Sequence, residues 1–344
     1  MRPTFSIIFF TVMSGAGYGL WILMALASLL IWPERPPGNG MAEVAWPNLL
    51  PCGLAAGFLL VSCGLVSSLG HLGQPQRAWR ALSQWRTSWL SREGIAAILT
   101  YLPVIGIGSA IFHDGRMPVD AMTGGDPLAA LWMSSEMRTV ASILLLAGSV
   151  ATILCTANIY ACLKPVRAWH NRHVVAGYLL IGIYSGALVA WALAALPQGQ
   201  IVDLRVLPVL VAVFAFATAL LKHRYWRFID HDPASSTADA TGLGSLGNVR
   251  SFEQPHTQEN YLTHEMGFRL ARKHSRKLRT ICLIAGFALP ALLALLGLAW
   301  PSLSAPAAWL ALIGGMSGIF VERWLFFAEA KHTVMLYYGA RNAD

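Results

Sequence analysis

The chain has 344 residues, of which 56% are hydrophobic and 12% are charged, and its mean hydropathy is +0.53. Because a soluble globular domain carries about 25% charged residues, this composition argues against a soluble enzyme and against a disordered tail. The five cysteines are too few for a disulfide scaffold. The net charge of +8 is compatible with a nucleic-acid partner, but in so apolar a protein the positions of the basic residues are more informative than their sum.

Eight apolar stretches are long enough to cross a membrane, whose hydrocarbon core of about 30 Å needs about 20 residues of helix. The first is too long for a cleavable signal peptide and lacks an Ala-x-Ala site. The sixth is the weakest, because it is short and carries Arg205 and Pro208 near its start. The pattern predicts an all-α integral membrane protein with eight transmembrane helices at 5–32, 49–70, 94–112, 139–163, 174–196, 204–221, 280–300 and 307–327.

The basic residues lie mostly in alternate connections. Twenty of the 25 Lys and Arg residues fall in the N-terminus, in the segments after spans two, four and six, and in the C-terminus. Because cytoplasmic loops are rich in Lys and Arg, we expect both termini in the cytoplasm and the protein in a bacterial inner membrane. The intervening connections hold four basic residues, Arg35, Arg116, Arg138 and Arg205.

Small residues four apart recur in the predicted spans and let helix backbones approach closely in lipid. The densest run is Ser14-Gly-Ala-Gly-Tyr-Gly19. It predicts either close helix packing or a groove for a flat ring or a lipid-like tail. The pairs with this spacing are Gly15/Gly19, Gly53/Gly57, Gly182/Gly186 and Gly314/Gly318.

The sequence does not predict a metal or haem site in this protein. The five cysteines all fall in predicted spans without Cys-x-x-Cys spacing, so we expect buried small hydrophobes rather than zinc or iron–sulfur ligands. A membrane b-type haem needs two histidines facing each other inside the bundle, and the ten histidines lie at span edges or in loops.

Two ionisable residues, Glu322 and Arg323, lie inside the eighth predicted span, and Glu329 follows seven residues after Glu322 on the same helix face. Such residues in a membrane pair with polar groups or serve a function. Ion pairing with neighbouring helices and a path for protons are both open at this stage.

The connection after the second span contains the residues that we expect to be chemically active. It places His71 at the end of that span and Glu93 at the start of the next, and between them lie four arginines (77, 80, 86 and 92) and three tryptophans (79, 85 and 89). One interpretation is an interfacial amphipathic turn with Ser91 capping the following helix. The other is a quinone site, because a quinol needs a partner at each of its two oxygens and a group that titrates near neutral pH. Histidine meets that need, and a carboxylate can relay the proton.

The motif His71-Leu-Gly-x-Pro-x-Arg77-Ala-Trp, followed by Ser88-Trp-Leu-Ser-Arg-Glu93, resembles the signature of the dimethyl sulfoxide reductase anchor subunits. The Ser14–Gly19 run and Glu322-Arg-Trp-Leu-Phe-Phe-Ala-Glu329 agree with that family. The resemblance implies two four-helix halves, 1–163 and 164–344. It also implies a subunit that binds quinone or menaquinone without haem and holds a molybdopterin catalytic subunit and a four-cluster iron–sulfur subunit at the membrane.

In that family the quinol-site histidine and glutamate fall on His71 and Glu93 of this sequence. The long connection at 222–280 departs from the sulfoxide reductases and is more similar to the anchor of cytoplasmic sulfite-oxidising molybdoenzymes. Its end, 260–279, predicts either a basic surface helix on lipid or a docking face. We expect the quinone pocket to involve Ser14, Gly15, Tyr18, His71, Gly73, Arg77, Trp89, Arg92 and Glu93. Partner docking is expected at Arg77, Arg80, Arg86, Arg272, Lys273, Arg276 and Lys277.

The sequence therefore predicts a quinone-reactive anchor of a molybdenum oxidoreductase, for sulfite oxidation or sulfoxide reduction. Two alternatives stay open. A membrane transporter would place charges at the midplane and show internal repeats, and a passive anchor would bind no quinone.

Overall fold

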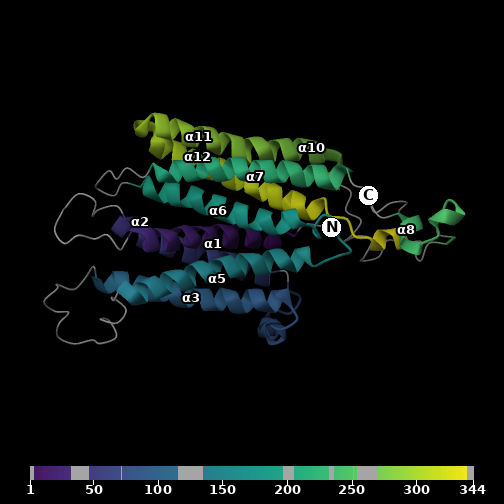
Figure 1. Ribbon diagram of the computed structural model, residues 1–344, viewed down its shortest axis with the longest axis horizontal. Coiled ribbons are helices and arrows are strands. Elements are labelled where there is room, and N and C mark those ends of the chain that lie inside the picture. Colours follow the sequence, from purple (N-terminus) through teal and green to yellow (C-terminus); the bar gives the residue numbers. More distant parts are fainter. Residues whose placement is uncertain are drawn as a thin grey trace.

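The computed structural model describes residues 4–31, 46–70, 72–114, 135–196, 205–231, 236–250, 252–253 and 270–338. The regular elements in these ranges are helical, and the long ones run side by side as one bundle (Figure 1). The long helices are α1 (Phe5–Ile31), α2 (Trp46–Leu69), α3 (Trp89–Asp114), α5 (Ser135–Ala161), α6 (Arg172–Ala194), α7 (Val206–His231), α10 (Leu270–Leu283), α11 (Leu289–Ala299) and α12 (Ser304–Ala328). The short elements are η2 (Pro75–Gln84), α8 (Thr237–Thr241), η4 (Gly244–Leu246), η6 (Pro301–Leu303) and α13 (Val334–Tyr337), and a π-helical turn, Ile284–Ala288, joins α10 to α11.

The prediction of eight spans is confirmed, since eight helical segments among the described residues are long and apolar enough to cross a membrane. The largest difference in bounds is at the sixth span, which continues to His231 rather than ending at residue 221. The predicted end of this span falls directly before the charged Lys222. In the structure Lys222 is buried, so it is not one of the basic residues of the loop.

Helix α1 lies at the centre of the arrangement. It packs against α2, α5 and α6 and also meets α12, while α3 packs on α5, and α7 and α12 pack on α6. The start of α1, the end of α12 and the short helix α8 lie at one end of the bundle (Figure 1). That end also carries η2, which precedes the start of α3. The segments that the sequence identified as basic are therefore gathered at one end.

Glycines set the closest helix contacts, as the small-residue spacing predicts. A Cβ at Gly19 would overlap the backbone of Gly182, and a Cβ at Gly186 would overlap the backbone of Gly19, so α1 and α6 touch backbone to backbone. Gly286 and Gly318 form a similar contact between the π-helical turn and α12. Gly15 is different, because a Cβ there would meet nothing within 4 Å.

A buried ion cluster joins α7 to α12. Lys222 Nζ lies 2.5 Å from the Glu322 carboxylate, and Arg323 donates to the same carboxylate through Nε and, at 2.7 Å, through Nη2. We call Lys222, Glu322 and Arg323 the inner cluster. All three side chains are at most 5% exposed, and the cluster holds two cations and one carboxylate. Ion pairing with a neighbouring helix is confirmed for Glu322, through Lys222 of α7, whereas the ion pair of Arg323 is with Glu322 on its own helix.

A second ion cluster lies nearer the helix ends. Arg279 on α10 donates to both carboxylate oxygens of Asp230 at 2.6 and 3.0 Å, and its Nε donates to Glu329 at 2.9 Å. We call these three residues the outer cluster. The indole of Trp226 lies between the clusters, 5.3 Å from Lys222 Nζ and 5.5 Å from Arg279 Cζ.

Two expectations need correction. Only Cys282 among the cysteines is buried, and Cys52, Cys63 and Cys162 lie on the outside of the bundle, where lipid rather than protein can cover a small apolar side chain. One interpretation of residues 260–279 is a basic surface helix on lipid. Its described part belongs to α10, which continues through the π-helical turn into α11 (Figure 1); residues 260–269 lie outside the described ranges.

Glycine replacements test the contact between α1 and α6. We expect Gly19→Ala to lower the stability of the protein by about 1–3 kcal/mol, because the added methyl forces two backbones apart. Gly108→Ala on α3 is the control, because a Cβ there also meets nothing within 4 Å, and we expect no loss, since alanine favours helix more than glycine does. Thermal unfolding of the purified complex in detergent measures both. Equal melting temperatures for the two variants would contradict the contact.

Two substitutions test the inner cluster. Glu322→Gln leaves two cations buried without their carboxylate, which costs about 3–5 kcal/mol. Lys222→Met leaves Glu322 paired with Arg323, so we expect the smaller loss of stability. Thermal unfolding, with Glu253→Gln at an exposed site as control, decides the order, and a larger loss for Lys222→Met would contradict the pairing.

Candidate functional site

The turn that precedes α3 is an exposed amphipathic 3-10 helix. In η2 the Arg80 guanidinium lies over the Trp79 ring, 5.6 Å from its centre. Directly after η2 the Arg86 guanidinium lies over the Trp85 ring in the same way, at 5.3 Å. Trp79 and Trp85 are both more than half exposed. Tryptophans of this kind settle at the interface between water and lipid, and paired arginines leave a positive surface there.

The start of α3 is fixed against this turn by side-chain bonds to backbone. The Ser91 hydroxyl donates to the carbonyl of Ala81 in η2, and Arg92 donates from Nε to the Trp85 carbonyl at 2.9 Å and from Nη2 to the Arg86 carbonyl at 2.6 Å. Arg92 also lies over the ring of Trp89 at 4.5 Å. The expectation that Ser91 caps α3 is wrong, because the helix begins at Trp89, before Ser91.

Glu93 follows one turn into α3 and points into the bundle. Its side chain is buried, and its carboxylate accepts a hydrogen bond from the Thr156 hydroxyl of α5. Within the described part of the protein no ion pair joins Glu93 to a cation. Burying a carboxylate without such a partner is costly, so buried carboxylates are often functional in membrane proteins. A buried carboxylate beneath an interfacial turn is suited to exchange a proton with a lipid-soluble molecule.

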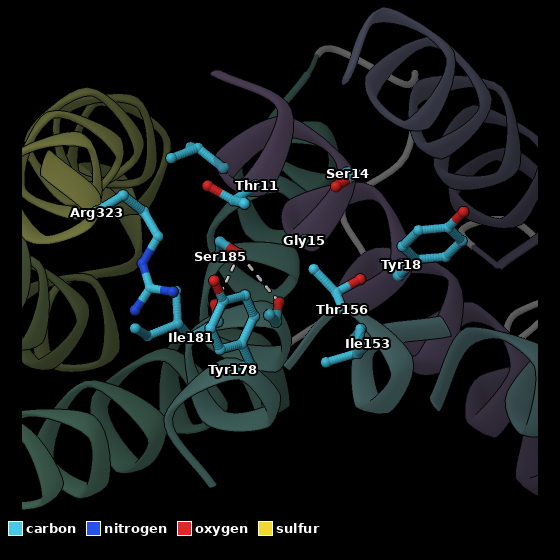
Figure 2. Close-up of a pocket in the computed structure, with 12 residues that line it drawn as sticks. Thr11, Ser14, Gly15, Tyr18, Ile153, Thr156, Tyr178, Ile181, Ser185 and Arg323 are labelled. Carbon is cyan, nitrogen blue, oxygen red and sulfur yellow. Dashed lines mark hydrogen bonds between the residues drawn. The ribbon is translucent and has the colours of Figure 1, made fainter. Parts of the chain in front are cut away.

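A small pocket lies next to Thr156, between α1, α5, α6 and α12. We call it the central pocket. Figure 2 shows Arg323 on one side of it and Tyr18 on the opposite side, with Thr156 toward Tyr18. Six of the lining residues carry a hydroxyl group: Thr11, Ser14, Tyr18, Thr156, Tyr178 and Ser185. The other lining residues are Val12, Gly15, Ile153, Ile181, Gly182 and Arg323.

Aromatic rings form the wall beside Arg323. The Arg323 guanidinium lies 4.5 Å from the ring centre of Tyr178 and 4.7 Å from that of Phe326. Tyr160 of α5 stacks on Tyr178 at 6.0 Å, so aromatic contacts connect the helix that bonds Glu93 to the helix that carries Glu322 and Arg323. Such contacts hold the rings in fixed positions.

The structure brings together four of the residues expected at a quinone pocket. Ser14, Gly15 and Tyr18 line the central pocket, and Glu93 is bonded to its wall through Thr156. Trp89 and Arg92 lie beside Glu93 at the start of α3. Gly73 and Arg77 are exposed, before and within η2. His71 lies outside the described residues.

The sequence analysis missed Thr156, Tyr178 and Lys222. Nothing in a single sequence distinguishes Thr156 from a threonine that faces lipid, since the bond it makes to Glu93 spans 63 residues. The sequence does indicate that Lys222 lies inside the sixth span, because Tyr225 and Trp226 continue the apolar face of that span beyond it. Arg276 and Lys277, expected to dock a partner, are exposed on α10 with Arg272 and Lys273 in the same helix.

The described residues contain no group of three or more His, Cys, Asp or Glu side chains that could hold a metal ion. Glu329 does not line the central pocket and belongs to the outer cluster, where its Oε2 has no hydrogen-bond partner within the part of the protein that the structure describes. A path for protons through Glu322, Arg323 and Glu329 stays a prediction.

Comparison with known proteins gives matches over nearly the whole sequence. The family model for the DMSO reductase anchor subunit (DmsC) matches residues 1–329. The sequence is 31% identical over 339 residues to the C subunit of sulfite dehydrogenase from Allochromatium vinosum, and the match covers 98% of this protein and 99% of that one.

Two Escherichia coli proteins match over shorter stretches. The YnfH chain of anaerobic dimethyl sulfoxide reductase is 29% identical over 136 residues, 40% of this protein and 42% of its own length. The C chain of anaerobic dimethyl sulfoxide reductase is 27% identical over 200 residues, 58% of this protein and 60% of its own length. With the eight apolar helices, these matches show that the protein belongs to the DMSO reductase anchor subunit family.

Proposed function

We propose that this protein, a multi-pass membrane anchor subunit by its family, reacts with quinone or menaquinone and exchanges electrons with a partner iron–sulfur subunit. Oxidation of a quinol releases two electrons and two protons; the electrons pass to the partner's nearest cluster, and Glu93 and His71 each accept one of the protons. The reverse sequence reduces a quinone. The anchor provides the site, the proton acceptor and the docking face, while the redox cofactors belong to the partners.

The observation that carries this proposal is the environment of Glu93. Its carboxylate is buried just beneath the interfacial turn η2 and is oriented by Thr156. A quinone head group travels in the lipid near the interface, so a proton acceptor at this depth can reach it. His71 immediately precedes this turn in sequence and is the proposed partner of the second quinone oxygen.

The partners and the sidedness follow from the charged end of the bundle. We infer that the exposed arginines of η2, with the basic face of α10, contact an acidic surface of a four-cluster iron–sulfur subunit that carries a molybdopterin catalytic subunit. The excess of Lys and Arg at this end favours a cytoplasmic location, at the inner membrane of a bacterium. The full-length likeness to a sulfite dehydrogenase subunit favours sulfite as the partner's substrate over a sulfoxide.

Replacing the carboxylate tests the proposal. We expect Glu93→Gln to lower quinone-linked turnover of the purified complex by about 100-fold or more, because a positioned acid–base group contributes about that much. Turnover with an artificial electron donor or acceptor that reacts directly with the partner subunits stays unchanged. Glu253→Gln, at an exposed carboxylate, is the control and keeps both activities.

The alternatives predict other results. A passive anchor keeps full quinone-linked turnover when Glu93→Gln and His71→Ala are combined. A transporter moves a solute across liposomes that contain this protein alone, and quinone analogues do not change that flux.

Charge reversal tests the docking face. We expect the double variant Arg80→Glu and Arg86→Glu to lose the partner subunits severalfold during purification, because like charges then face each other across the contact. The ratio of iron–sulfur subunit to anchor after affinity purification measures the effect. Arg205→Glu, just before α7 and at the opposite end of the bundle, is the matched control, and an equal loss in both variants would contradict this docking face.

A further inference from the structure

The central pocket contains a buried hydroxyl group without a hydrogen-bond partner. Tyr178 lines the pocket and is less than 10% exposed, and its Oη has no hydrogen-bond partner within the described residues, although Arg323 lies beside it. Tyr18 also lines the pocket, but its hydroxyl points away from it (Figure 2). Leaving a buried hydroxyl unpaired costs about 1–3 kcal/mol. Nearly all such groups in proteins are paired with protein or with ordered water, so the pocket needs a polar occupant.

The size of the pocket selects that occupant. Its free volume, measured for the centre of a water molecule, is about 20 Å³, and a water needs about 10–15 Å³ measured in this way. The α1 and α6 backbones touch at Gly19 and Gly182, one helical turn from Gly15, and this contact limits how far the pocket can widen.

The pocket also lies between opposite charges. Arg323 lines one side and uses Nε and Nη2 on Glu322, which leaves the two hydrogens of Nη1 for another acceptor. Thr156 lines the pocket toward Tyr18, and its hydroxyl lies within hydrogen-bond distance of both the Glu93 carboxylate and the Thr152 carbonyl, the latter at 3.0 Å. When its one hydrogen goes to an ionised Glu93, its oxygen can accept a bond from the pocket side. A water between these groups accepts on the Arg323 and Tyr178 side and donates on the Thr156 side.

We propose that the central pocket binds an ordered water that completes a hydrogen-bond chain from Arg323, through Thr156, to Glu93, and that this series of bonds stabilises Glu93 in its ionised, proton-accepting form. Arg323 and Tyr178 are then positioning residues for Glu93. This inference rests on the proposed function, because it explains how a buried carboxylate stays ready to accept a proton.

The charges agree with this role. The inner cluster holds two cations and one carboxylate, and the neighbouring outer cluster holds one cation and two carboxylates. Of these charged groups Arg323 lines the central pocket, as does Thr156, the hydrogen-bond partner of Glu93, so a positive charge and Glu93 lie on either side of it. The other groups near Glu93 are Arg92 on its own helix, Tyr18 on α1, Cys155 and Tyr160 on α5, and Tyr178 on α6. Of these, Arg92 is bonded to the carbonyls of the preceding turn.

Two substitutions test for the water, one that fills the pocket and one that removes a hydroxyl group from its wall. Both leave Lys222, Glu322 and Arg323 unchanged. Gly15→Val places methyl groups in the open space that faces the pocket, and Tyr178→Phe removes one hydroxyl but keeps the ring. Gly108→Val is the matched control, since a Cβ at Gly108 on α3 also meets nothing within 4 Å. A high-resolution density map of the purified complex shows whether a water lies within bonding distance of Tyr178 Oη and Thr156 Oγ1, and whether Gly15→Val removes it.

Infrared titration of the same complexes reads out the protonation of Glu93 directly. The carboxyl band that disappears in Glu93→Gln is followed against pH. We expect this band to appear at least about one pH unit higher in Gly15→Val and in Tyr178→Phe than in the parent or in Gly108→Val, since one charge-assisted hydrogen bond is worth about that much.

An empty pocket in the map, or a quinone ring or lipid tail in the pocket, would contradict the proposal that it binds an ordered water. An unchanged band position in both variants would overturn the positioning role. Each of these results leaves the proposed function intact if Glu93→Gln still abolishes quinone-linked turnover. Loss of the quinone role instead shows as full turnover in Glu93→Gln, whatever the map contains.

Discussion

The contact between α1 and α6 at Gly19, Gly182 and Gly186 is the constraint on which the rest of the structure depends. It brings the two backbones together without side chains between them, and it joins the helices of the first half to those of the second. In lipid no hydrophobic force draws helices together, so association relies on such close packing. Because Gly15 lies one helical turn before Gly19, the face of α1 that meets α6 at Gly19 opens onto the central pocket at Gly15.

Buried charges are placed around this contact in a way that pairs them across helices. Glu322 accepts from Lys222 and Arg323, and the outer cluster places Arg279 between two carboxylates. Trp226 separates the two clusters. A charge in a membrane interior without a partner costs about 3 kcal/mol or more, so pairing across α7, α10 and α12 also fixes how these helices pack.

The candidate site makes use of both features. The interfacial turn η2 holds the start of α3, which places Glu93 inside the bundle, and α5 supplies the hydroxyl that orients its carboxylate. The α1–α6 contact at Gly19 and Gly182 keeps the pocket behind Thr156 small. The proposed reaction with quinone needs such a fixed arrangement, because the distances from the site to the quinone and to a partner's cluster must both be maintained.

The sequence by itself determined the membrane class, the number of spans and the family, and it singled out Glu93 as a candidate, because apolar length, charge placement and the motif at 71–93 are local properties. It also indicated that Glu322 and Arg323 are buried. Only the tertiary structure decided that Lys222 completes their cluster, that Thr156 and Tyr178 lie beside the site, and which glycines pack and which one opens a pocket. These are pairings between residues tens of positions apart, and helix periodicity sets the face of a residue but not the neighbour that the face will meet.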